Sequence, residues 1–177
     1  SYIVKNTNNI ILIGPMGTGK TTIGRQLAKN LSVSFYDSDH EIEKRTGVKI
    51  ALIFEIEGVE GFRRRETQIL NELSQMNNIV LSTGGGAVTR AENRKTLKNN
   101  GHIIYLKSSP EILFKRTADD KNRPLLQTDD RLSQIRKILA EREPIYIEMA
   151  DEVIDSEKKS SKQIIQKILE QIDNENH

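Results

Sequence analysis

The segment Gly14–Thr21, with the sequence GPMGTGKT, constrains the fold of this chain more than any other feature. It follows the apolar run Ile10–Ile13 and precedes a helical pattern, so it lies between an expected strand and an expected helix. The spacing Gly-x-x-x-x-Gly-Lys-Thr is typical of the loop that wraps the phosphates of a nucleoside triphosphate. A simple glycine-rich turn is the alternative, and the match in a strand–loop–helix context makes that alternative much weaker.

The residue types in this loop suit the binding of phosphate. Glycines let the chain approach an anion closely, so that successive backbone N–H groups point at it, and the following helix adds its positive end. Lys20 supplies a mobile positive charge for the outer phosphates, and Thr21 offers a hydroxyl to Mg²⁺. The loop therefore predicts a nucleotide substrate and leaves the acceptor to be found.

Alternation of short β-like runs with helical patterns predicts the fold class. The β-like runs are 10–13, 34–36, 79–82, 103–106 and 152–154. Apolar stripes at helical spacing lie between and after them, at Ile69, Leu70, Leu73 and Met76, at Leu132, Ile135 and Leu139, and at Ile164, Ile165, Ile168, Leu169 and Ile172. This pattern predicts a parallel sheet covered on both faces by helices. The length of 177 residues is that of one domain.

Three unusual segments directly follow strands of this expected sheet. They are Gly14–Thr21, Asp37–Asp39 and Thr83–Gly86. Ligands bind beyond the carboxyl ends of the strands in such sheets, so we expect all three segments to crowd one edge.

Asp37 and Asp39 place two carboxylates at the end of a strand. One can hold Mg²⁺, which prefers oxygen ligands, while the other orients an acceptor hydroxyl and receives its proton. The alternative is that Ser38 or Asp39 caps a helix, and capping and catalysis need not exclude each other.

Two further segments suggest how an acceptor is gripped. The run Gly84–Gly86 is costly in backbone entropy and makes sense where a small ligand touches bare backbone, although a loose turn is the alternative. Phe62–Glu66 begins an expected long helix, on which Arg63 and Glu66 share a face. A guanidinium held by a carboxylate is preorganised to bind a second carboxylate, so an anionic small substrate is indicated.

Two arginines lie farther along the chain. Arg123 is in the polar segment 119–130, whose composition is that of a surface loop, and it can swing over the phosphates when the site closes. A surface arginine on a hinge is the alternative. Arg142, near the end of the next expected helix, is a candidate for a second grip on the acceptor.

Composition excludes some functions. The net charge is +2, from 27 basic and 25 acidic side chains, and offers no electrostatic case for nucleic acid. There is no cysteine, so disulfides and thiolate metal sites are excluded, which fits a reducing cytosol. No window approaches the roughly 20 apolar residues of a membrane span. We expect a cytoplasmic monomer that binds neither nucleic acid nor membrane.

Taken in order, these motifs resemble those of shikimate kinase. The ordered set is the phosphate loop, Asp-Ser-Asp, Phe-Arg-Arg-x-Glu, Gly-Gly-Gly, Arg-Pro-Leu-Leu and Arg-x-Pro-x-Tyr, and it runs from Asn9 to Ile154. The resemblance implies an α/β, three-layer P-loop kinase fold with a five-stranded parallel sheet in the order 2-3-1-4-5. It also implies a single domain, 1–177, with a shikimate-binding segment at about 38–66 and a lid at about 117–130.

The resemblance further implies transfer of the γ-phosphoryl of ATP to the 3-hydroxyl of shikimate, with Mg²⁺, on the route to chorismate and the aromatic amino acids. The implied catalytic residues are Asp39, Lys20 and Arg123. The implied ATP-binding residues are Gly17, Thr18, Gly19, Lys20, Thr21, Thr22, Arg116, Arg123 and Lys159. The implied shikimate-binding residues are Asp39, Arg63, Glu66, Gly84, Gly85, Gly86 and Arg142, and the implied metal ligands are Thr21 and Asp37.

One departure and two rival functions stay open. Some family members have proline where this chain has Lys158–Ser161, so the second contact to adenine, opposite Arg116, is expected from the backbone of Lys159. A gluconate kinase would share the phosphate loop and the acidic pair but would not account for Phe62–Glu66 and Gly84–Gly86. A nucleotide-binding module without transfer would bind ATP and phosphorylate no hydroxy acid.

Overall fold

The chain forms a five-stranded parallel sheet in a computed structural model that describes residues 8–118 and 130–175. The strands are β1 (Ile10–Ile13), β2 (Ser34–Asp37), β3 (Ile79–Ser82), β4 (His102–Lys107) and β5 (Glu152–Asp155). They pair in the order β2-β3-β1-β4-β5, and all four pairings are parallel. This confirms the predicted sheet order and all five predicted strands, with β2, β4 and β5 slightly longer than expected.

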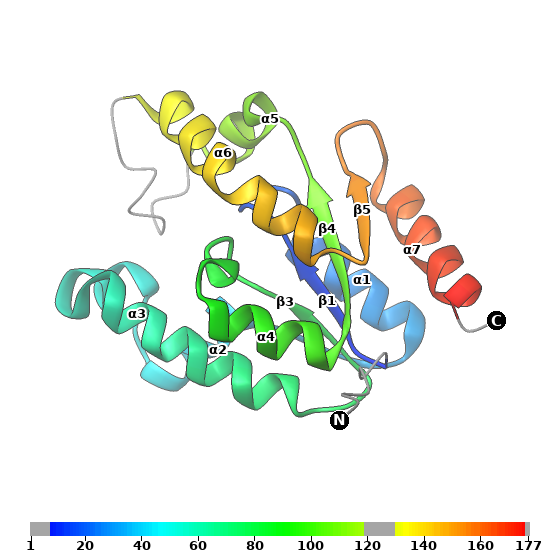
Figure 1. Ribbon diagram of the computed structural model, residues 1–177, viewed down its shortest axis with the longest axis horizontal. Coiled ribbons are helices and arrows are strands. Elements are labelled where there is room, and N and C mark those ends of the chain that lie inside the picture. The colour runs from blue at the N-terminus through cyan, green and yellow to red at the C-terminus, as the bar shows by residue number, and fades with distance from the viewer. Residues whose placement is uncertain (1–7, 119–129, 176–177) are drawn as a thin grey trace.

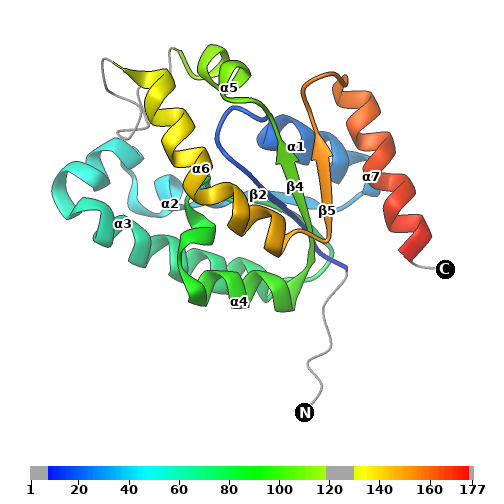
Figure 2. The ribbon, with the colours of Figure 1, turned by 45° about the horizontal axis from the view of Figure 1, so that its top comes forward.

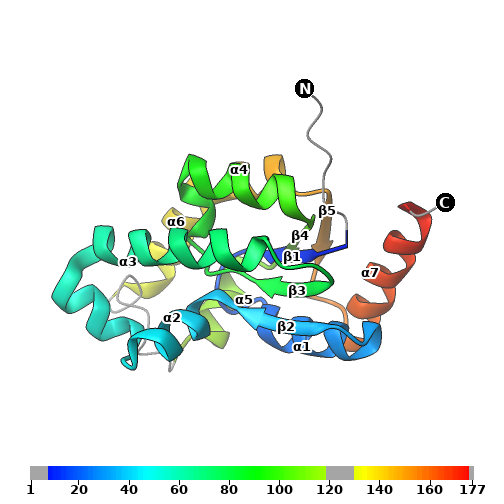
Figure 3. The ribbon, with the colours of Figure 1, turned by 90° about the horizontal axis from the view of Figure 1, so that it is seen from below.

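Helices cover both faces of this sheet and give three layers. The helical elements are α1 (Lys20–Leu31), α2 (Ser38–Thr46), α3 (Ile50–Ser74), η1 (Ala87–Thr89), α4 (Ala91–Asn100), α5 (Pro110–Arg116), α6 (Arg131–Met149) and α7 (Ser161–Glu175). Helices α1 and α7 lie on one face, and α3, α4 and α6 on the other (Figures 1 and 3). Seen from a tilted direction, α3 and α7 lie at opposite ends of the molecule with α6 between them (Figure 2).

The central strand, β1, is apolar at every position because both of its faces are buried. Ile11 and Ile13 pack into the core beneath α3, α4 and α6, while Ile10 and Leu12 pack into the core beneath α1 and α7. Successive side chains of a strand point to opposite faces, so a strand buried on both faces has no polar position. The stripe on α7 is likewise core, since Ile168 is fully buried.

Two expectations about α3 were wrong. The helix begins at Ile50 and not at Phe62, and Gly58 interrupts it with φ 73° and ψ −177°, a conformation open essentially only to glycine. The helix also ends at Ser74, which leaves Met76 outside it and 37% exposed, although Met76 was expected to continue the apolar stripe. The break changes the direction of α3, so the part before Gly58 is not collinear with the part after it (Figure 1).

Residues 119–129, which hold most of the expected lid and Arg123, lie outside the described residues. In the part of the chain that the structure describes, no helix combines the length and the apolar character that a membrane crossing needs.

Candidate active site

The phosphate loop connects β1 to α1. Gly17 and Gly19 have φ values of 88° and 89°, in the left-handed region that favours glycine. Gly19 precedes α1 and provides no side-chain cap, so the first N–H groups of the helix are available to an anion. The Nζ atom of Lys20 donates to the carbonyls of Gly14 and Pro15, at 2.6 and 2.7 Å, and therefore lies against the loop.

Thr21 and Asp37 form an oxygen pair beside this loop. Oγ1 of Thr21 donates to Oδ2 of Asp37 at 2.8 Å, and Oδ1 of Asp37 accepts from the backbone N–H of His40 at 3.1 Å. Asp37 therefore caps α2, the role that the sequence alternative assigned to Ser38 or Asp39. Hydroxyl and carboxylate oxygens are the ligands that Mg²⁺ prefers, and both lie next to the phosphate loop. The pair thus fits a magnesium ion bound together with phosphate.

A pocket of about 410 Å³, here called the acceptor pocket, contains every residue predicted to bind the acceptor. Its lining residues are Met16, Asp39, Phe54, Phe62, Arg63, Glu66, Gly84, Gly85, Gly86 and Arg142. They come from the phosphate loop, α2, α3, the turn after β3, and α6. Two guanidinium groups, two carboxyl groups and two aromatic rings therefore surround one small space, which suits a small anionic molecule with an apolar face.

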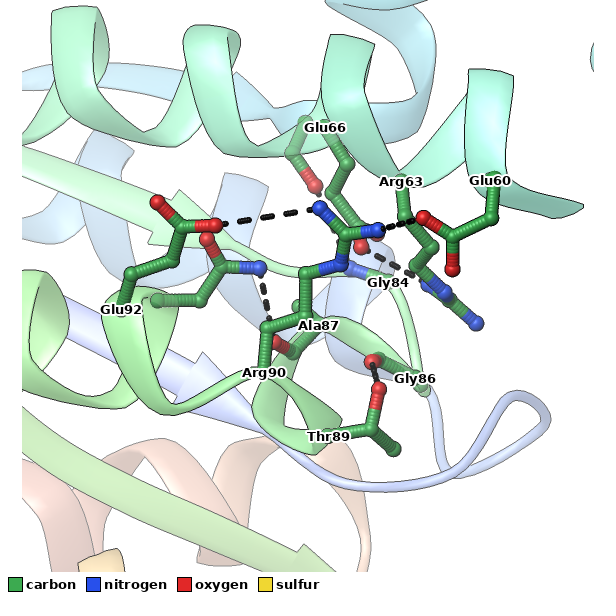
Figure 4. Close-up of polar contacts among 12 residues, drawn as sticks. Glu60, Arg63, Glu66, Gly84, Gly86, Ala87, Thr89, Arg90 and Glu92 are labelled. Atoms are coloured by element: carbon green, nitrogen blue, oxygen red, sulfur yellow. Dashed lines mark hydrogen bonds and ion pairs between the residues drawn. The ribbon is translucent and has the colours of Figure 1, made fainter.

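The three glycines after β3 are explained by the charged side chains that lie against them. A Cβ atom added at Gly86 would lie 2.1 Å from Nη2 of Arg63, and one at Gly84 would lie 2.8 Å from Oδ1 of Asp39. The turn itself is ordered, because Gly84 donates to Oγ of Ser38 and its carbonyl accepts from the N–H of Ala87. Figure 4 shows Arg63 and Glu66 beside this turn. The loose-turn alternative is therefore wrong.

Glu66 holds Arg63 in place at the floor of the acceptor pocket. Oε1 of Glu66 accepts from Nη1 of Arg63 at 2.7 Å, and the side chain of Glu66 is fully buried. Burial raises the pKa of Glu66 to about 7, although Arg63 lowers it, and the nearby Asp39 adds to the rise. A carboxyl with a pKa near neutrality beside two arginines is a feature typical of functional sites.

A second pocket, the phosphate pocket, adjoins the acceptor pocket. It encloses about 630 Å³ and includes Lys20, Thr21, Thr22 and Asp37. The two pockets share Met16, Asp39, Gly84 and Gly85. Asp39 therefore stands at the boundary between the phosphate loop and the acceptor pocket.

A third pocket, the nucleoside pocket, continues from the phosphate pocket on the far side of the loop. It encloses about 710 Å³ and is lined by Thr18, Arg116, Ser156, Lys159 and Ser161, among others. Nη1 of Arg116 donates to the carbonyl of Gly17 at 3.0 Å, and Nζ of Lys159 donates to the carbonyl of Asp155 at 3.2 Å. The structure thus places Arg116 and Lys159, the two residues that the resemblance assigns to adenine, on one pocket.

Sequence reasoning gave no role in the site to four of its residues. Met16, Phe54 and Phe62 line the acceptor pocket, and Tyr146 donates from its hydroxyl to the carbonyl of Gly85 at 2.6 Å. Neither Met16 nor Phe54 has a sequence signal that separates it from core residues. Tyr146 does carry one, because it follows Arg142 by four residues on a helix and so shares its face.

Comparisons with known proteins point to one family. The family model described as shikimate kinase matches residues 16–173. The shikimate kinase of Nitrosococcus oceani is 54% identical over 164 residues, which cover 93% of this chain and 86% of the relative. That of Thiobacillus denitrificans is 56% identical over 153 residues, which cover 86% of this chain and 84% of the relative.

Solved structures distinguish the predicted family from the rival interpretation, a gluconate kinase. Shikimate kinase from Acinetobacter baumannii in complex with shikimate has a TM-score of 0.93 and 48% identity, covering 97% of this chain and 96% of that chain. A gluconokinase from Sinorhizobium meliloti has a TM-score of 0.56 at 14% identity, covering 96% of this chain and 94% of that chain, a likeness of fold alone. Since the family model spans most of the sequence and the relatives share about half of their residues with it, the chain belongs to the shikimate kinase family.

Proposed function

We propose that this protein transfers the γ-phosphoryl group of ATP to the 3-hydroxyl of shikimate, giving 3-phosphoshikimate and ADP. The observation that carries the proposal is the place of Asp39, at the boundary between the phosphate pocket and a pocket with two arginines. Such a boundary is where an acceptor hydroxyl would meet a terminal phosphate. The family relationship supports the choice of shikimate over other anionic acceptors.

Asp39 orients the acceptor hydroxyl and receives its proton. A bond forms between the hydroxyl oxygen and the γ-phosphorus, and the bond from that phosphorus to the β–γ bridging oxygen breaks, which leaves ADP. Lys20 and the N-terminus of α1 hold the phosphates and neutralise the charge that develops on them. When bound, Mg²⁺ held by Thr21 and Asp37 would supply further positive charge for the phosphates.

Arg63 and Arg142 clamp the shikimate carboxylate, with Glu66 orienting Arg63. Gly85 and the neighbouring glycines present their backbone to the acceptor. The rings of Phe54 and Phe62, whose centroids are 4.7 Å apart, provide the apolar wall of the same pocket.

The nucleoside pocket accepts the adenosine portion of ATP. Arg116 stacks on the adenine, and the backbone at Lys159 contacts it from the other side. Arg123, in the lid outside the described residues, approaches the phosphates when the site closes.

A coupled assay of ADP release tests the function directly. With Mg²⁺ and ATP, we expect ADP release to depend on shikimate and not on gluconate, and the product to be phosphorylated shikimate. Asp39→Asn keeps the size of the side chain and removes its basicity, so turnover is expected to fall by roughly a hundredfold or more. Release of ADP at the same rate with and without shikimate would contradict the transfer reaction and favour a nucleotide-binding module.

A further inference from the structure

The carbonyls of the glycine turn are all bound by the protein, and one of them is bound from a distant element. The carbonyl of Gly84 accepts from the N–H of Ala87, and that of Gly86 accepts from the N–H of Thr89. The carbonyl of Gly86 also accepts from the hydroxyl of Thr89 (Figure 4). Both contacts arise within the turn. The carbonyl of Gly85 instead accepts from the hydroxyl of Tyr146 on α6, which is 61 residues away in sequence.

Holding this carbonyl also sets the direction of an N–H group. In a trans peptide the carbonyl of one residue and the N–H of the next point in opposite directions. The bond from Tyr146 to Gly85 therefore fixes where the N–H of Gly86 points. Among the described residues, the N–H groups of Gly85 and Gly86 have no hydrogen-bond acceptor, and both residues line the acceptor pocket. Glycine backbone has wide conformational freedom, so the bond from Tyr146 restricts this peptide beyond what the bonds within the turn do.

Tyr146 is itself held firmly enough to serve as that contact. It is fully buried, and its ring stacks on Tyr105 with centroids 4.9 Å apart. The hydroxyl of Tyr105 donates to Oε2 of Glu143 at 2.7 Å, which fixes the stacking partner in turn. Burial raises the pKa of Tyr146 to about 12, more than the nearby Arg142 lowers it, so the hydroxyl keeps its proton at neutral pH.

We propose that Tyr146 is a positioning residue of the acceptor pocket, whose hydroxyl holds the Gly85–Gly86 peptide so that its N–H faces the bound acceptor. This inference rests on the proposed function, because the acceptor is taken to be shikimate. The same tyrosine lies one helical turn from Arg142, so it ties the backbone donor and one guanidinium of the clamp to the same face of α6.

Tyr146→Phe tests the inference because it removes the hydroxyl and keeps the ring and its stack. We expect the KM for shikimate to rise about tenfold, the size of one lost hydrogen bond in the binding site. The KM for ATP and the kcat are expected to change less than twofold, because the contact is made equally in the bound and the reacting complex. Tyr105→Phe is the matched control: it removes a hydroxyl from the same stack without touching the glycine turn, and its shikimate KM should stay near that of the wild type.

Any of three kinetic results would overturn the inference. They are an unchanged shikimate KM in Tyr146→Phe, an equal rise in the KM for ATP, and an equal effect of Tyr105→Phe. Unfolding of Tyr146→Phe below the assay temperature, measured by circular dichroism, would overturn it too, because the hydroxyl would then support the fold. If the wild type phosphorylates shikimate and Tyr146→Phe behaves like it, only the role of Tyr146 is rejected. Wild-type enzyme that does not phosphorylate shikimate would reject the proposed function and this inference with it.

Discussion

The carboxyl of Glu66 is buried, paired with Arg63 and close to Asp39, which makes the stability of the protein depend on pH near neutrality. Its pKa is about 7 in the folded protein against an ordinary value of 4.5. Between these pH values the folded state keeps a proton that the unfolded state has lost, so the free energy of unfolding falls as pH rises. At 1.36 kcal/mol per pKa unit, the loss is at most about 3 kcal/mol and is complete above the folded pKa.

Glu66→Gln tests this dependence because glutamine cannot titrate. Urea unfolding of both proteins from pH 5 to pH 8 should show the wild type losing stability relative to the variant as pH increases. The difference should level off above about pH 8, once the carboxyl is ionised in both states. Parallel stability profiles would mean that the carboxyl of Glu66 titrates in the folded protein as it does in the unfolded chain.

Gly86 is needed because Arg63 occupies the space where a side chain would start. Its φ of −94° is open to any residue, so Gly86→Ala should fold normally, but the added methyl would lie 2.1 Å from Nη2 of Arg63. Arg63 would have to move, and the shikimate KM should rise at least about tenfold while the KM for ATP stays unchanged. Steady-state kinetics with each substrate varied in turn would measure both constants.

A double-mutant cycle shows whether the alanine acts through the arginine. If it does, Gly86→Ala should add little to the defect of Arg63→Ala, because the group that it displaces is already gone. Additive effects would place the damage in the backbone of the turn and not in the position of Arg63.

At the scale of the element, the break in α3 determines the shape of the acceptor pocket. Phe54 precedes Gly58, and Phe62 follows it; the break lets the two rings meet with centroids 4.7 Å apart. Glu57 bridges the break by a two-contact ion pair with Arg65, at 2.6 and 2.8 Å. Both partners are largely exposed, so this pair contributes little to stability and mainly favours one geometry.

Gly58→Ala should therefore harm both stability and acceptor binding. The conformation at Gly58 is essentially closed to alanine, so the variant should lose roughly 1–3 kcal/mol of unfolding free energy or straighten the helix. Because straightening the helix relieves this strain, Phe54 should leave the pocket and the shikimate KM should rise. Gly47→Ala is the matched control, since Gly47 also has a positive φ, at 75°, but ends α2 with no atom within 4 Å of an added Cβ. It should lose stability without a change in KM, whereas equal KM effects would show that the break has no special role.

Across the whole molecule, the sequence predicted the parts of the fold that local patterns determine. Strands β1, β3 and β4 are centred on short runs of buried apolar residues, and Gly14–Thr21 identifies both the loop and its neighbours. The break at Gly58 was missed because the expected helix began at Phe62, so this glycine lay outside any predicted helix. The contact of Tyr146 with Gly85 was missed because it joins residues far apart in sequence, and no local pattern records which backbone a buried hydroxyl will reach.

The adjoining pockets predict that each ligand can stabilise the protein separately. A ligand at one hundred times its Kd adds about 2.7 kcal/mol to the free energy of unfolding, which corresponds to a rise in Tm of about 5–11 °C for a chain of this size. Lys20 lines the phosphate pocket and Arg63 the acceptor pocket, and neither residue lines both. Lys20→Ala should therefore abolish most of the shift caused by ADP with Mg²⁺ and keep the shift caused by shikimate, whereas Arg63→Ala should do the reverse. Thermal unfolding with each ligand alone measures all four shifts. If both variants lost both shifts, the substitutions would be disturbing the shared sheet edge, and the division into two pockets would not describe how the ligands bind.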